Sequence, residues 1–177
     1  HDHAGILELN ADTLSVQRWT DGAINAQEIL FHQNRLFLAR TGHGDVAEYE
    51  PKSMKITRLL PAGSTVRELA AAGGYLYAAG YFTTEVVTIE LESGQVIGRI
   101  KMGTLIRDLM VDTESLYAAN WHGIAGVGLA QTHQTLTQPP VLAIANLDTI
   151  SNISDSLLYG YYRLLSDFPG IGVKREL

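Results

Sequence analysis

The 177-residue chain is 46% hydrophobic and carries a formal charge of −6 at pH 7. This acidic balance, without any basic cluster, argues against nucleic acid as the main partner. The sequence has no cysteine, which excludes disulfides, cysteine-ligated zinc and thiol catalysis. It also lacks the run of ~18 apolar residues that crosses a bilayer, so we expect no membrane span.

The chain opens with two short strands expected at residues 5–9 and 15–19. A repeat with a period of 40 residues follows: similar segments begin at Ala26, Val66 and Ile106, and a weaker fourth copy begins at Asn146. Internal periods of roughly 40–45 residues made of short strands are typical of β-propeller blades. We therefore predict an all-β fold, a β-propeller of four-stranded blades of about 40 residues each.

The second repeat shows the pattern of one blade most clearly. Its strands are expected at residues 67–72, 75–79, 85–91 and 95–101, and the glycines at 73–74 and 94 favour tight hairpin turns. Small alanines crowd the first two strands, which would lie innermost, where blades converge. The same pattern places full blade units at residues 26–63, 66–103 and 106–145, the last with a long polar loop at 131–140.

The two ends of the chain resemble two halves of one blade. Residues 5–22 match an outer strand pair, and residues 147–163 match an inner pair. Together they would form a composite blade that closes a four-bladed ring and protects its edges. Residues 164–177 would then be a tail. Alternatively, this segment begins a further outer strand and the chain is part of a larger propeller.

Two segments resemble the repeat signature of YVTN-type propellers, namely Leu116-Tyr-Ala-Ala-Asn120 and residues 85–103. The resemblance covers roughly residues 5–162 and implies a propeller. Proteins of this broad group include surface-layer and exported proteins, which leads us to expect a periplasmic or extracellular location. Related propellers carry haem d1 or quinone chemistry or act as lactonases. No catalytic residue of that group can be assigned to this sequence.

The repeat predicts a recognition surface at one face of the propeller. In each blade, the loop before the first strand and the loop between the second and third strands share that face. The aromatic, basic and histidine side chains gathered there would contact a protein, glycan or small-molecule ligand. The alternative is that these side chains only shape turns and cap the core. The candidate ligand-binding residues are Arg40, His43, Arg67, Tyr81, Arg107, Trp121, His122 and Tyr161.

One carboxylate recurs in every repeat, at Glu28, Glu68, Asp108 and Asp148. Four acids at equivalent positions of innermost strands would surround a central channel, and acids held close together need a cation, arginine partners or raised pKa values. Ion pairs with Arg67 and Arg107 or structural hydrogen bonds would satisfy them. A channel cation such as Ca²⁺ is the second interpretation, because oxygen ligands suit it. Ligand binding is the third.

These features favour a non-catalytic binding or scaffold propeller, because no catalytic motif accompanies the repeat. One alternative is a propeller enzyme of the quinoprotein, haem d1 or lactonase kind, with His43, His122, Arg67 and Arg107 in cofactor, acid–base or anion-binding roles. The other is a structural part of a larger propeller that another chain completes, which would associate through an open edge.

Overall fold

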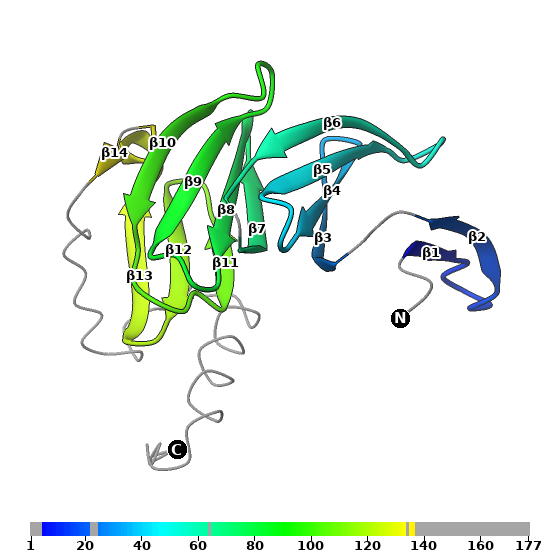
Figure 1. Cartoon of the computed structure of the whole chain (residues 1–177), viewed down its shortest axis with the longest axis horizontal. Helices are drawn as coiled ribbons and strands as arrows, with labels where there is room; N and C mark the ends of the chain where they lie inside the picture. Colours follow the sequence, from blue (N-terminus) through cyan, green and yellow to red (C-terminus); the bar gives the residue numbers. More distant parts are fainter. Residues whose placement is uncertain (1–4, 22–24, 64, 134, 137–177) are drawn as a thin grey trace, which may run out of the picture.

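The computed structural model describes residues 5–21, 25–63, 65–133 and 135–136. These residues form four sheets that follow one another in chain order (Figure 1). A two-stranded ribbon of β1 (Gly5–Leu9) and β2 (Val16–Asp21) comes first. The last part of the blade unit expected at 106–145 and the inner strand pair expected at 147–163 lie outside the described residues. No described helix is long and apolar enough to cross a membrane.

Three further sheets correspond to the three repeats. The first unit is an antiparallel sheet of β3 (Ala26–His32), β4 (Arg35–Arg40), β5 (Asp45–Glu50) and β6 (Lys55–Pro61). The second unit consists of β7 (Val66–Ala72), β8 (Tyr75–Gly80), β9 (Glu85–Glu90) and β10 (Val96–Lys101). The third unit has β11 (Asp108–Val111), β12 (Ser115–Asn120) and β13 (Gly123–Gly128).

The backbone repeats with the same period as the sequence. Leu14, Met54 and Gly94 lie 40 residues apart in equivalent hairpins, and they have positive φ angles of 56°, 53° and 74°. This conformation suits glycine and strains other residues, so only the third hairpin has the residue that its geometry favours. Leu14 has a positive φ angle, as do Met54 and Gly94, which lie in the turns between outer strands. The β1–β2 ribbon therefore has the turn of an outer strand pair.

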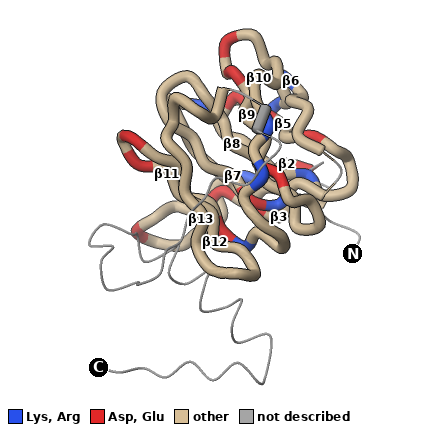
Figure 2. Tube along the Cα trace, turned by 90° about the vertical axis from the view of Figure 1, so that its left-hand side faces the viewer, with Lys and Arg blue, Asp and Glu red and all other residues tan. Residues whose placement is uncertain are grey.

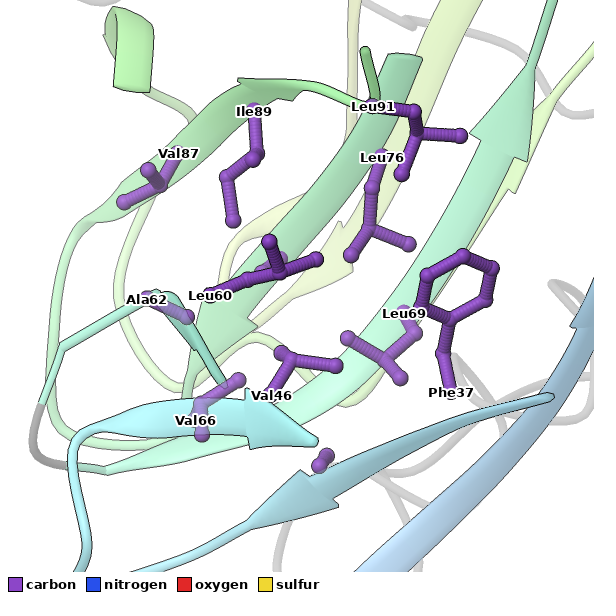
Figure 3. Packing of buried hydrophobic residues seen from close by; sticks show 12 residues of the cluster. Phe37, Val46, Leu60, Ala62, Val66, Leu69, Leu76, Val87, Ile89 and Leu91 are labelled. Atoms are coloured by element: carbon purple, nitrogen blue, oxygen red, sulfur yellow. The ribbon is translucent and has the colours of Figure 1, made fainter. Parts of the chain in front are cut away.

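The core lies between adjacent units. Alternate side chains of the first unit, including Phe37, Val46 and Leu60, pack against Leu69 and Leu76 of the second unit (Figure 3). The opposite face of the second unit packs in the same way against the third unit. The second sheet is therefore apolar on both faces, and the sheets beside it supply the burial that stabilises it.

The innermost strands lie next to one another as a consequence. β7 has β3 on one side and β11 on the other. This arrangement brings the beginnings of β3, β7 and β11 close together. The repeat predicted that the recurring carboxylates would gather at this centre.

The loop after the third unit returns to the second unit. After a short 3₁₀ helix η1 (Leu129–Gln131), strand β14 (Thr135–Leu136) pairs with β10 in parallel, with Arg99 opposite Thr135 and Ile100 opposite Leu136. The polar loop expected at residues 131–140 thus contains a short outer strand beside β10.

The first unit has one face that the described residues cover only in part. Ile6 of β1 packs against Leu38 and Tyr49 on that face. Ile29, which lies opposite Leu38 in the ladder, and Phe31 are 54% and 61% exposed. The sheets that the structure describes therefore do not close into a ring.

Candidate functional site

A β-bulge begins the innermost strand of the first two units. In β3, Ala26 pairs with Arg40 and Glu28 with Ala39, so Gln27 is an extra residue. In β7, Val66 pairs with Gly80 and Glu68 with Ala79, so Arg67 is extra. Successive strand residues normally point to opposite faces, and a bulge re-aims them.

The bulges place sequence neighbours in one pocket of about 160 Å³, which we call the inner-strand pocket. Acidic and basic positions lie close together where β3 and β7 begin (Figure 2). Two strands each contribute a consecutive pair of side chains, and the residue before β11 adds a second guanidinium. The lining residues are Gln27, Glu28, Arg67, Glu68 and Arg107.

Tyr81 holds the two arginines of this pocket. The guanidinium carbons of Arg67 and Arg107 lie 5.3 and 4.3 Å from the centre of the Tyr81 ring. Arg107 also donates a hydrogen bond from Nη2 to the Tyr81 hydroxyl oxygen at 2.6 Å. Phe82 packs edge-on against Tyr81 and remains 76% exposed. Cation–π contacts and this hydrogen bond therefore fix both cations beside an exposed aromatic side chain.

Glu28 connects two units and has an altered acidity. Its Oε2 accepts a hydrogen bond from the backbone N–H of Leu69, a group on the inner edge of the second sheet. Burial raises the pKa of Glu28 from its ordinary value of 4.5 to about 8; Glu68 and Asp108 add to the rise, and the Leu69 N–H opposes it. At neutral pH the Glu28 carboxyl therefore carries its proton.

The other two described acids of this series differ from Glu28. Glu68 forms an ion pair with Arg67, with 3.4 Å between Oε1 and Nε. Burial raises the pKa of Asp108, and a hydrogen bond from the Leu109 N–H opposes that rise. Within the described ranges, no group of three or more His, Asp or Glu side chains is placed to hold a metal ion. Asp148 lies outside those ranges, so the channel cation stays a prediction.

Arg40 and His43 lie apart from the inner-strand pocket. Arg40 makes a bidentate ion pair with Asp45, with both N–O distances at 2.7 Å. His43 is exposed in a tight turn between Gly42 and Gly44, whose φ angles are 89° and 80°. The structure therefore assigns Arg40 a local pairing role, and the turn accounts for the glycines beside His43.

The equivalent loop of the third unit is held by Asn120. The buried Asn120 side chain donates from Nδ2 to the Met102 carbonyl oxygen at 2.7 Å and accepts from the His122 N–H at 2.8 Å. Trp121 is half-buried and His122 is exposed. Neither of these two lines the inner-strand pocket, and Tyr161 lies outside the described residues.

The sequence did not predict a second pocket, which lies at the other end of β7. It has a volume of about 490 Å³ and is lined mainly by apolar atoms of the second and third units. The rings of Tyr75 and His133, with centroids 4.2 Å apart, form one side.

Comparisons with known proteins identify the fold. No protein-family profile matches the chain, and no curated protein does. Among solved structures, hydrazine synthase from Kuenenia stuttgartiensis is 17% identical with a TM-score of 0.59, covering 62% of this chain and 34% of that one. A WD40 domain from Neurospora crassa is 13% identical with a TM-score of 0.60, covering 76% and 47%. Glutaminyl cyclase from Myxococcus xanthus is 17% identical with a TM-score of 0.54, covering 73% and 59%.

The chain is therefore built as a β-propeller, as the repeat predicted. It spans only about a third to three-fifths of the length of these three structures. They include both enzymes and a WD40 domain, so the likeness identifies the fold alone. Membership of the YVTN-type family stays a prediction.

Replacing Glu28 with Gln should change how stability depends on pH. In the wild type, the unfolded chain loses this proton near pH 4.5 and the folded chain near pH 8. Between those values the folded state binds more protons, so the free energy of unfolding falls as pH rises, by at most about 1.4 kcal/mol per pH unit. Glu28→Gln should remove this slope while its amide oxygen still accepts the Leu69 N–H.

Urea unfolding across this pH range measures the effect. Glu92→Gln, at an exposed glutamate, is the matched control and should keep the wild-type slope. If the wild-type and Glu28→Gln curves run parallel from about pH 5 to about pH 8, the acidity assigned to Glu28 is refuted.

Proposed function

We propose that this chain is a non-catalytic binding propeller, which holds a polar group of a protein, glycan or small-molecule ligand at the inner-strand pocket. The observation that carries the proposal is the pair of guanidinium groups, Arg67 and Arg107, stacked on the single ring of Tyr81. Cations that are already oriented lose little freedom when a ligand binds. Phe82 offers apolar contact area beside them.

The positions of the histidines favour binding over catalysis. A propeller enzyme would use His43 and His122 together with the arginines, but neither histidine lines the pocket that contains Arg67 and Arg107. The exported location and the YVTN-type relationship are parts of the same proposal and rest on the repeat signature.

Peptide and glycan arrays probed with the purified chain test this proposal. We expect ligands whose binding falls by about 10- to 100-fold in Arg107→Gln, because a charge-assisted hydrogen bond contributes about 1.5–3 kcal/mol. Arg99→Gln is the control, since Arg99 lies on β10 and outside the pocket. An array without ligands, or ligands that bind Arg107→Gln and wild type equally, would contradict the proposal.

A second candidate function is that of a partial propeller completed by another copy of the chain. The exposed Ile29 and Phe31 on the inner strand of the first unit favour it. In a propeller this face packs against a neighbouring blade, and large exposed apolar side chains there mark an interface.

Light scattering tests this second candidate. The 19.3-kDa chain should have the mass of a dimer or a larger assembly, and Phe31→Glu should return it to a monomer because a charge cannot be buried unpaired there. Phe82→Glu, at an exposed phenylalanine in the loop between β8 and β9, should leave the assembly unchanged. A monomeric wild type would count against this candidate.

A further inference from the structure

The size of the inner-strand pocket limits what it holds. Its volume of about 160 Å³ is well below the ≈ 300–1,000 Å³ of pockets that enclose a whole small molecule. It therefore has room for one functional group, while the rest of the ligand stays outside. Every lining residue is polar or charged, so that group is itself polar.

The cations of the pocket suit a planar anion. Arg67 and Arg107 both approach the Tyr81 ring, and two like charges held near one another are stabilised by an anion between them. Guanidinium groups match the geometry of a carboxylate, because their N–H donors can pair with both of its oxygens. Arg40 shows this bidentate match with Asp45, and Arg67 already has a carboxylate partner in Glu68, with 3.4 Å between Nε and Oε1.

The protonation state of Glu28 affects the charge that a ligand meets in the pocket. Glu28 faces Glu68 and Asp108 as well as Arg67 and Arg107, and its raised pKa keeps it neutral at neutral pH. A neutral carboxyl adds a hydrogen-bond donor to the pocket, whereas an ionised one adds a negative charge. A protonated Glu28 would therefore admit an anion, and an ionised Glu28 would repel it.

We propose that the inner-strand pocket binds a carboxylate group, either of a free acid or of an acidic side chain, and that Glu28 must keep its proton for binding. This inference rests on the proposed binding function and names its ligand chemistry and its regulation. No bond is formed or broken, and the proton stays on Glu28 when the carboxylate binds.

Calorimetric titration with two probes tests the proposal. Acetate represents the free acid, and a tripeptide Gly-Glu-Gly blocked at both ends represents the side chain. If only the protonated pocket binds, the dissociation constant rises about tenfold between about pH 7 and about pH 9, because the protonated fraction of a group with a pKa near 8 falls by that factor. The matched Gly-Gln-Gly peptide should not bind.

Three variants test the roles of Glu28 and Arg107 separately. Glu28→Gln cannot ionise, so its affinity for the bound probe should not change with pH. Arg107→Gln should lose at least tenfold in affinity at both pH values, and Arg99→Gln should behave as the wild type. Binding of one probe alone identifies the source of the carboxylate.

Three results would overturn the inference. They are the absence of binding by either probe, an affinity for the probes that does not vary with pH in the wild type, and tighter binding of ethylammonium than of acetate. The array experiment decides the proposed function separately. Ligands that depend on Arg107 but carry no carboxylate would leave that function intact and remove this inference.

Discussion

The inner edge of each repeat's sheet presents backbone N–H groups that no neighbouring strand pairs in a hydrogen-bonded ladder, and the polar centre of this propeller depends on that constraint. Unpaired backbone groups near a core are costly, so side chains must satisfy them. Glu28 does so by accepting the N–H of Leu69 in the next unit. The same contact joins two sheets that also meet through an apolar core and through hydrogen bonds from Arg58 to the Leu91 and Glu92 carbonyl oxygens. A carboxyl group is thereby fixed where its environment disfavours a negative charge.

The bulges turn this structural centre into a pocket. Without the extra residue in β7, the side chains of Arg67 and Glu68 would point to opposite faces of the strand. With it, both line one cavity together with Arg107. Tyr81 comes from the loop after the second strand of the same unit and supports both arginines. Charged side chains from separate repeats thus meet in one site. The bulges, the packing of the inner strands and the Tyr81 ring bring them together.

The sequence predicts the repeated strands well, because the 40-residue period and alternating apolar residues follow directly from blade geometry. It also places Arg67, Tyr81 and Arg107 on one face of the propeller, and the structure brings these three side chains together. The sequence does not show that Arg40 lies outside this group. Arg40 occupies an equivalent loop position, but its guanidinium pairs with Asp45, five residues along the chain. The bulges at Gln27 and Arg67 have no glycine signal, and Leu14 and Met54 take positive φ angles that glycine would normally indicate. Backbone hydrogen bonds from Leu14 to Asn10 and from Met54 to Glu50 close these two turns without glycine.

Direct titration of Glu28 tests the central claim that three inner strands enclose it among other charges. The carboxyl carbon of selectively ¹³C-labelled glutamate, assigned by comparison with Glu28→Gln, reports its ionisation by NMR. The structure predicts a midpoint near pH 8. Glu68→Gln should lower that midpoint, because it removes a neighbouring negative charge. A midpoint at the ordinary value of 4.5 would show that Glu28 is not held in this environment and would contradict the account.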